Sequence, residues 1–221
     1  MREWQKDRIL YNLTKNQKEY LHQRFIKKFF NDNELEKYKQ ELLDSPIYQE
    51  LISKRTPDDL SFKGTPYMLY AIVRKTKPTL TIETGVDHGF SSTVILDALQ
   101  HNNHGELISI DLNLHPEFCG SYVPNSLKNR WVFLKGKTSD ILPTIDKDIN
   151  LFFHDSDHKY ENQFFEYNWA WEHMKSKGVI TSHDIGASNA FFNFAMIKNI
   201  DYYTIKTTGN MYRFGVIVKN R

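Results

Sequence analysis

Short apolar runs alternate with amphipathic stretches from about Ser61 to the C-terminus. Short runs rich in β-branched and aromatic residues are typical of strands, and the stretches between them have helical spacing. The predicted strands are Leu80–Glu83, Leu107–Asp111, Trp131–Leu134, Leu151–His154 and Val179–Ser182. The predicted helices are Pro66–Thr76, Ser91–Gln100, Ser139–Ile145 and Tyr160–Met174. This alternation predicts a parallel sheet with helices on both faces.

The C-terminal end has a different pattern. Two β-rich runs, Tyr202–Lys206 and Tyr212–Val218, flank the turn residues Thr207-Thr208-Gly209-Asn210. Gly and Asn accept the backbone conformations of tight turns, so these runs predict a terminal antiparallel hairpin. The whole pattern predicts an α/β fold with a Rossmann-like, seven-stranded, mostly parallel sheet.

The N-terminal segment has helical spacing and no strand pattern. Its first predicted helix carries an apolar stripe at steps of about four residues, formed by Tyr20, Leu21, Phe25 and Phe29. Glu34–Leu43 and Ile47–Ser53 fit two further helices. A basic amphipathic helix can bind membranes or acidic partners, but packing on its own domain is the favoured interpretation. We expect a helical extension over residues 1–55, acting as a lid, a cover or a dimer surface, before a domain over residues 56–221.

Composition narrows the function classes. The 29 basic and 27 acidic residues nearly balance, so the net charge of +2 gives no concentrated basic face for nucleic acid. The single cysteine, Cys119, cannot form an internal disulfide, which fits a reducing compartment. Met1–Leu10 is charged and lacks the apolar core of a signal peptide, and no apolar run is long enough to span a membrane. We therefore expect a cytoplasmic protein that uses neither nucleic acid nor membrane as a partner.

Ligands of open α/β sheets bind outside the carboxyl ends of the strands, so the residues that follow each strand are the candidates. After the first predicted strand comes Glu83–Ser92, with the spacing G-x-x-x-G at Gly85 and Gly89. These glycines allow a sharp turn and a close approach to a ligand, and Ser91 or Ser92 can cap the next helix. The spacing is not the dinucleotide fingerprint G-x-G-x-x-G.

Two further strand ends carry polar groups. Asp111 ends the second predicted strand, 26 residues after Gly85, where an acidic side chain can accept hydrogen bonds from both hydroxyls of a ribose. With the glycine turn, this favours a nucleoside site over a simple Asx turn. After the third strand, Thr138 or Ser139 can cap a short helix, and their hydroxyls and amides can meet an adenine edge. Capping alone explains these two residues equally well.

The fourth and fifth strand ends hold the densest group of titratable residues, in His154–His158 and His183-Asp184. Carboxylates and imidazoles brought together at strand ends can bind a divalent cation or serve as acid and base. Oxygen ligands from Asp155 and Asp184 would suit Mg²⁺, whereas ligation by His183 would favour a transition metal. Asp157 or His158 is the candidate base, because both side chains follow the strand end into the cleft.

In this order, the motifs resemble those of class I methyltransferases that use S-adenosylmethionine (AdoMet). They are most similar to the small O-methyltransferase groups that include catechol O-methyltransferase and the sugar and macrolide O-methyltransferases. Phe153–Tyr160 resembles the fourth-strand motif of a broad methyltransferase group, and Gly178–Asp184 continues the match. Lys63-Gly64 resembles the segment before the first strand of the catechol enzyme.

The resemblance implies a role for each motif. The glycine turn holds the methionine moiety, Asp111 binds the ribose, and the segment after the third strand lies by the adenine. The implied cofactor residues are Glu83, Gly85, Gly89, Ser91, Asp111, Thr138, Ser139 and Asp155. The candidate catalytic residues are Asp155, Asp157 and His158, and the candidate metal ligands are Asp155, His183 and Asp184. Metal-dependent relatives usually carry Asp-Asp or Asp-Asn where this chain has His183-Asp184, so the need for Mg²⁺ or another divalent cation stays open.

The resulting hypothesis is an AdoMet-dependent O-methyltransferase that acts on a small-molecule hydroxyl. One alternative is an NAD-dependent oxidoreductase with a similar sheet, against which the missing G-x-G-x-x-G and the terminal hairpin argue. The other is a non-catalytic partner subunit that keeps the fold, against which the acidic cluster argues. The acceptor's identity and a homodimeric state are left open by the sequence.

Overall fold

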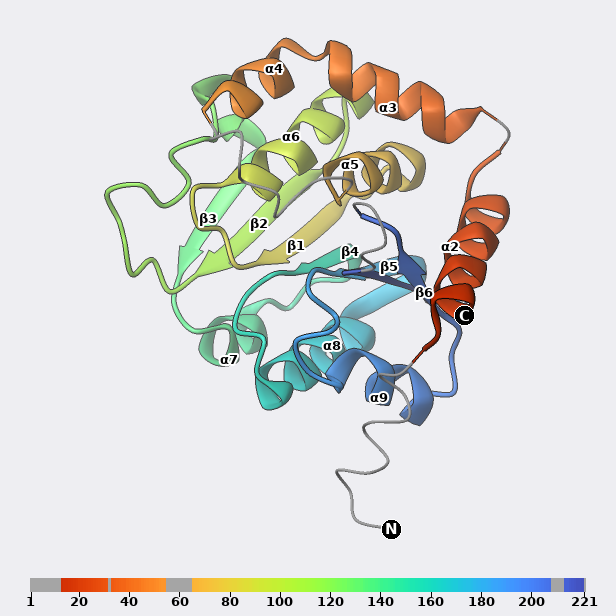
Figure 1. Ribbon diagram of the computed structural model, residues 1–221. Helices are drawn as coiled ribbons and strands as arrows, with labels where there is room; N and C mark the ends of the chain where they lie inside the picture. The colour runs from red at the N-terminus through yellow and green to blue at the C-terminus, as the bar shows by residue number, and fades with distance from the viewer. Residues whose placement is uncertain (1–12, 32, 55–64, 208–212, 221) are drawn as a thin grey trace.

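Seven strands form one mixed sheet in the order β3-β2-β1-β4-β5-β7-β6 (Figure 1). The computed structural model describes residues 13–31, 33–54, 65–207 and 213–220. The five parallel strands are β1 (Leu80–Thr84), β2 (Glu106–Asp111), β3 (Trp131–Lys135), β4 (Ile149–His154) and β5 (Met174–Ser182). The chain leaves β1 toward β2 and β3 on one side and later returns to β4 on the other. This reversal places the switch point between β1 and β4, where the predicted ligand site belongs.

The terminal hairpin is confirmed. Strand β7 (Phe214–Val218) pairs antiparallel with both β5 and β6 (Tyr202–Ile205), so β7 lies inside the sheet and β6 forms its edge. Of the predicted turn residues, 208–210 lie outside the described part of the chain, as do Lys63-Gly64 and residues 1–10.

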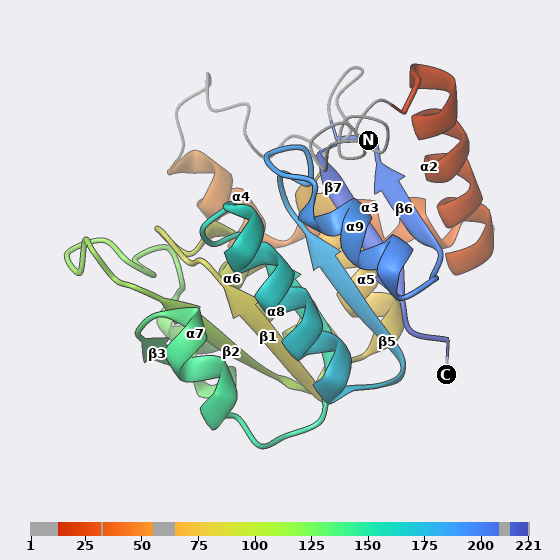
Figure 2. The same cartoon turned by 90° about the horizontal axis from the view of Figure 1, so that it is seen from below.

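Helices cover both faces of the sheet, as predicted (Figures 1 and 2). One face carries α5 (Thr65–Thr76) and α6 (Phe90–Asn102), and the other carries α7 (Thr138–Ile141), α8 (Tyr160–His173) and α9 (Ala190–Ile197). Consecutive residues of β4 point to opposite faces: Phe153 joins the core under α5 and α6, and Phe152 joins the core under α8 and α9. The 3₁₀ turns η2 (Asn125–Arg130) and η3 (Leu142–Thr144) lie in the connections before β3 and β4. Within the described ranges, no helix is long and apolar enough to cross a membrane.

Sequence periodicity missed α9 and part of β5. Helix α9 has the sequence AFFNFAMI, which is apolar on nearly every side and therefore has no polar face to reveal its period. Its residues Phe191 and Phe194 are fully buried against the sheet. Strand β5 begins at Met174 rather than at Val179, and its register opposite β4 is irregular. The sequence did not predict this first part of the strand because its residues after Met174 are exposed and include two lysines, so they form no apolar run.

The predicted N-terminal helices are confirmed as α2 (Lys15–Phe29), α3 (Glu34–Asp44) and α4 (Pro46–Ser53). Helix α2 lies along the edge strand β6, where the rings of Phe25 and Tyr203 have centroids 5.2 Å apart. Leu42 of α3 and Leu51 of α4 are buried in the same core as α5 and α6. The apolar faces of all three helices thus extend the core of the sheet.

A polar contact also joins α3 to α5. Glu41 accepts hydrogen bonds from Tyr70 Oη at 2.7 Å and from the Arg74 guanidinium, whose Nη2 lies 3.0 Å away. The guanidinium can bond both carboxylate oxygens at once, which fixes the relative position of the two helices. We infer that α2–α4 unfold together with the sheet.

This inference predicts the effect of a cavity in α3. Leu42→Ala removes a fully buried side chain, so we expect the free energy of unfolding to fall by about 2–5 kcal/mol. Urea titration followed by circular dichroism would measure the loss. Leu114→Ala is the matched control, because Leu114 is 75% exposed and its truncation should change stability by less than about 0.5 kcal/mol. A separate early transition for α2–α4, with the sheet unaffected, would contradict cooperative unfolding.

Candidate active site

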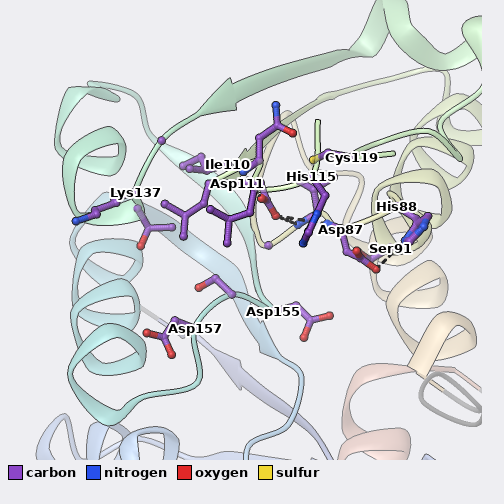
Figure 3. A pocket seen from close by; sticks show the side chains of 18 of the residues that line it. Asp87, His88, Ser91, Ile110, Asp111, His115, Cys119, Lys137, Asp155 and Asp157 are labelled. Atoms are coloured by element: carbon purple, nitrogen blue, oxygen red, sulfur yellow. Dashed lines mark hydrogen bonds and ion pairs between the residues drawn. The ribbon is translucent and has the colours of Figure 1, made fainter. Parts of the chain in front are cut away.

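A cavity of about 900 Å³ opens at the carboxyl ends of β1, β2, β3 and β4 (Figure 3). Its walls come from four segments: the turn after β1, the loop after β2, the start of α7 and the loop after β4. The predicted site residues on these walls are Gly85, Ser91, Asp111, Thr138, Ser139, Asp155 and Asp157. The sheet therefore brings together side chains from four separate motifs. Five other predicted site residues do not line the cavity: Glu83, Gly89, His158, His183 and Asp184.

The turn after β1 needs both of its glycines. Gly85 has φ +85°, and a Cβ there would lie 2.1 Å from the carbonyl oxygen of Asp155. Gly89, with φ +88°, is the N-cap of α6. This corrects the prediction that Ser91 or Ser92 caps that helix, since both serines lie within its first turn. Their hydroxyls turn toward the sheet instead.

Those hydroxyls meet a buried carboxylate. Glu83 is fully buried and accepts hydrogen bonds from Ser91 (2.6 Å), Ser92 (2.5 Å) and Ser109 (2.6 Å). Burial raises the pKa of Glu83 to about 7, although the three serine hydroxyls oppose this shift. Glu83 thus lies beneath the cavity and ties β1 to α6 and β2, while Ser91 stands between it and the cavity.

Asp111 lies on the cavity wall and holds the glycine turn. Its Oδ2 accepts a hydrogen bond from the amide of Val86 at 2.7 Å, and its Oδ1 accepts one from the amide of Asn113 at 2.6 Å. A carboxylate offers about four lone-pair positions, so Asp111 retains acceptor capacity toward the cavity. The same side chain can shape the turn and bind a ligand.

The segment after β3 differs in detail from its prediction. Lys137 is the N-cap of α7, so neither Thr138 nor Ser139 caps the helix. The Thr138 hydroxyl donates to Asn162 of α8 at 3.1 Å, and the Ser139 hydroxyl donates to Asp140 at 3.0 Å. Both residues remain on the cavity wall, close to the end of β3.

A second group of polar residues begins at Asp155. The Nδ1 of His183 lies 3.2 Å from Asp155 Oδ1, and the Nε2 of His158 lies 3.7 Å from the same oxygen. Asp184 Oδ2 is 3.6 Å from His183 and 3.8 Å from His158. Ligand atoms of Asp155, His158 and His183 all lie within 4.8 Å of one another. Asp155 is thus the residue shared by the cavity and this cluster.

The donor set differs from the predicted metal ligands. His158 joins Asp155 and His183 as a close donor, whereas Asp184 lies at the margin and faces Arg213, with Nε 3.8 Å from Oδ1. Asp184 has φ +43°, a left-handed backbone conformation that Asp tolerates better than most residues with a side chain.

The two candidate bases have different surroundings. Asp157 is half exposed and lies 3.3 Å from Lys159; burial slightly opposes its ionisation, but hydrogen bonds from Lys159 lower its pKa. His158 has a lowered pKa, because partial burial and the neighbouring His154 outweigh the carboxylates of Asp155 and Asp184. A neutral imidazole can accept a proton near neutral pH, which is the property that a candidate base needs.

Sequence reasoning missed the carboxylate behind His158. Glu166 of α8 is fully buried and lies 2.7 Å from His154 Nδ1, and His154 Nε2 lies 3.2 Å from His158 Nδ1. One signal was available: Glu166 occupies a helix position beside Tyr167 and Ala170 that faces the sheet, where a charged residue needs a partner.

The sequence also did not predict that the loop after β2 lines the cavity. His88 stacks on Phe118 with ring centroids 4.5 Å apart, and His115 stacks on the same ring at 5.0 Å. These residues and Tyr122 line the cavity. No periodic pattern marks this loop, so its position depends on the long-range fold.

Comparison with known proteins agrees with this geometry. Residues 82–185, from β1 to the turn after β5, match the family model described as a methyltransferase domain. Residues 82–185 are therefore similar to a methyltransferase domain. The match spans the glycine turn, Asp111, the segment after β3 and the Asp–His cluster, so it contains every predicted site residue. No curated protein matches the sequence.

Solved structures share the fold of this chain. An O-methyltransferase from Bacillus cereus in complex with SAH has a TM-score of 0.60 at 15% identity, covering 93% of this chain and all of that one (100%). An O-methyltransferase from Streptomyces achromogenes involved in tomaymycin synthesis, in complex with SAM, has a TM-score of 0.62 at 17% identity, covering 92% and 99%. These likenesses extend over the N-terminal helices as well, and the predicted class I methyltransferase fold is confirmed.

The burial of Glu83 predicts a pH-dependent stability. Its folded pKa of about 7 lies above the ordinary value of 4.5, so the folded state binds more protons than the unfolded state between these values. The free energy of unfolding should therefore fall as the pH rises through this window, with a contribution from Glu83 on the order of 1–3 kcal/mol.

Glu83→Gln should remove that contribution, and urea unfolding at a series of pH values would measure it. Glu106→Gln is the control, because Glu106 is exposed at the start of β2 and should leave the slope unchanged. An identical slope in wild type and Glu83→Gln would show that Glu83 titrates normally.

Proposed function

We propose that this protein transfers the methyl group of AdoMet to a hydroxyl oxygen of a small-molecule acceptor. The observation that carries the proposal is a single cavity whose walls join the glycine turn, Asp111, the Thr138-Ser139 segment and Asp155. The methyltransferase family model supports the reaction class, and SAH and SAM in the structural relatives support the cofactor.

Each wall suits one part of the cofactor. The turn at Gly85 allows backbone to approach the methionine moiety, and Asp111 can accept hydrogen bonds from the ribose. Thr138 and Ser139 lie at the adenine end. Glu83 and Gly89 act indirectly: Glu83 anchors Ser91 from below, and Gly89 sets the start of α6. The volume of about 900 Å³ is at the upper end for small-molecule sites, which supports a place for an acceptor beside the cofactor.

The reaction is an in-line displacement at the sulfonium methyl. A bond forms between the acceptor oxygen and the methyl carbon while the carbon–sulfur bond breaks, and sulfur keeps the electron pair as a neutral thioether. The acceptor hydroxyl loses its proton, which needs a base. The cofactor is already activated, so the protein mainly aligns the two partners and excludes water.

The acceptor hydroxyl is proposed to bind beside the cluster of Asp155, His158 and His183, which we call the acceptor pole. Its donor set of one carboxylate and two imidazoles fits a divalent transition metal better than Mg²⁺, which prefers oxygen ligands. Asp155, His158 and His183 would hold such a cation, which would lower the pKa of a bound hydroxyl. The metal-free alternative uses His158 itself as the general base.

The two rival functions are less well supported. An NAD-dependent oxidoreductase would need a dinucleotide turn, whereas the turn after β1 falls within the methyltransferase match. A non-catalytic subunit would have no need of a carboxylate and two imidazoles gathered at the edge of the cavity, as Asp155, His158 and His183 are. The homodimer, the cytoplasmic location and a lid or dimer role for residues 1–55 stay predictions.

Asp111 tests the cofactor site. Asp111→Ala removes the charged acceptor, so we expect AdoMet affinity to fall by about 1.5–3 kcal/mol, or roughly 10-fold to 150-fold, in calorimetry. Asp146→Ala is the control, because Asp146 is an exposed acid in the loop before β4 and lies outside the cavity wall. Unchanged affinity in folded Asp111→Ala would remove Asp111 from the site.

Chelation tests the acceptor pole in a methyl-transfer assay with a hydroxyl acceptor panel. With a bound cation, EDTA should abolish turnover and Mn²⁺ or Co²⁺ should restore it better than Mg²⁺. His183→Asn should then raise the metal concentration that is needed. Full activity in EDTA would exclude the cation, and His158→Ala should in that case lower kcat by about 10²–10⁴-fold.

A further inference from the structure

We propose that the edge of the sheet at β6 is a docking surface for an anionic lipid bilayer. Its parts are the outer face of α2 and the exposed end of α9, two helices that flank β6 (Figures 1 and 2). We call it the β6-edge surface, and its residues are Tyr20, Gln23, Arg24, Lys27, Lys28, Met196, Ile197 and Lys198. None of these residues lines the cavity, so the proposal does not rest on the proposed reaction.

Two tyrosines at the start of β6 hold the flanking helices in place. The ring centroid of Tyr203 lies 5.2 Å from that of Phe25 in α2. The ring centroid of Tyr202 lies 5.5 Å from that of Phe192 in α9. Successive side chains of a strand point to opposite faces of the sheet, so α2 and α9 cover opposite faces and both border the edge that β6 forms.

The outer stripe of α2 is basic. It follows steps of three and four residues and lines a shallow hollow of about 410 Å³, and its members are Tyr20, Gln23, Arg24, Lys27 and Lys28. The Oδ2 of Asp201 lies 2.9 Å from Arg24 Nη2 and 3.6 Å from Lys28 Nζ. One carboxylate thus serves two cations, and the exposed Lys27 adds a third positive charge beside them.

Positive charge is concentrated at this edge. Helix α2 and the segment from Lys198 to Lys206 together carry seven basic and two acidic residues, a net charge of +5, whereas the whole chain has +2. The rest of the chain is therefore net acidic, and the fold gathers a basic face that the balanced composition conceals. Charge asymmetry of this kind attracts anionic surfaces, most strongly within a Debye length of about 8 Å at physiological salt.

Exposed apolar side chains distinguish a bilayer from other anionic partners. Tyr20 is 64% exposed on the basic stripe, and Met196 and Ile197 are 57% and 63% exposed at the end of α9. Asp201, the shared partner of the two cations, follows that helix end by four residues. A nucleic acid would neutralise the cations but leave the two apolar side chains of α9 in water. A bilayer takes both, because its headgroups attract cations and its interface accepts apolar side chains.

Co-sedimentation of the full chain with lipid vesicles tests the proposal. We expect wild type to sediment with phosphatidylcholine vesicles that contain about 30% phosphatidylserine, and to stay in the supernatant with phosphatidylcholine alone. Binding should weaken as the salt concentration rises from about 0.05 M to about 0.5 M, because salt screens the attraction between the cations and the headgroups.

Two double variants separate the charged and apolar contributions. Lys27→Gln with Lys28→Gln removes two cations, each of which contributes about fivefold near an anionic leaflet, so vesicle affinity should fall by roughly 25-fold. Met196→Ser with Ile197→Ser should lower the affinity by at least about 10-fold and leave its salt dependence unchanged. All four side chains are exposed, so the variants should keep the melting temperature of wild type.

The matched control is Lys128→Gln with Lys135→Gln. Both lysines are exposed near β3, at the opposite edge of the sheet, and the variant loses the same net charge. It should bind vesicles as wild type does. An equal loss of affinity in this control, equal binding to phosphatidylcholine alone, or no sedimentation of wild type would each overturn the proposal.

A nucleic acid is the competing occupant of the β6-edge surface. Fluorescence anisotropy with a labelled single-stranded RNA would detect it, and we expect RNA to bind more weakly than the anionic vesicles. If RNA bound through Lys27 and Lys28, and vesicle affinity were unchanged by Met196→Ser with Ile197→Ser, the surface would be assigned to nucleic acid and the bilayer proposal overturned.

Discussion

The contact between the ends of β1 and β4 is the constraint on which the site depends. The amide of Asp155 donates to the carbonyl of Thr84 at 2.8 Å, and the next residue, Gly85, leaves no room for a side chain against the Asp155 backbone. This contact lies at the switch point of the sheet, where the chain turns away on both sides. It fixes Asp155 beside the glycine turn, so one carboxylate borders both the cavity and the cluster that it forms with His158 and His183.

Two buried glutamates organise the halves of the site that meet at this contact. Glu83 is surrounded by hydroxyls without a positive partner, and burial raises its pKa to about 7. Glu166 has a histidine and further donors around it, and its pKa is lowered despite equal burial. Burying a carboxylate is unfavourable unless its hydrogen bonds are complete. Glu83 therefore holds together β1, β2 and the start of α6 around the glycine turn, and Glu166 contacts His154 at the end of β4.

The features that were predicted correctly from the sequence are those that depend on a local pattern of residues. Strand ends could be placed because buried parallel strands are continuous apolar runs, and Gly85, Asp111 and Asp155 follow such runs directly. Helix caps were predicted less well, since a serine one residue inside a helix looks like a serine at its cap. Glu166 was not predicted at all. Its partners come from β1, β4 and the loop after β4, and no fixed spacing in the sequence shows that these segments meet at Glu166.

This difference explains why the cavity walls could be predicted better than the cluster around Asp155. The cavity walls consist of backbone turns and single side chains at strand ends, which short motifs can record. In the cluster, His158 lies 3.2 Å from His154, which lies 2.7 Å from Glu166, and its other ring nitrogen lies 3.7 Å from Asp155 and 3.8 Å from Asp184. The same imidazole would be a base, a ligand or a donor to a carboxylate according to which nitrogen carries the hydrogen. The surroundings of His158 therefore come from three separate segments, the end of β4, helix α8 and the turn after β5, and no short motif records their meeting.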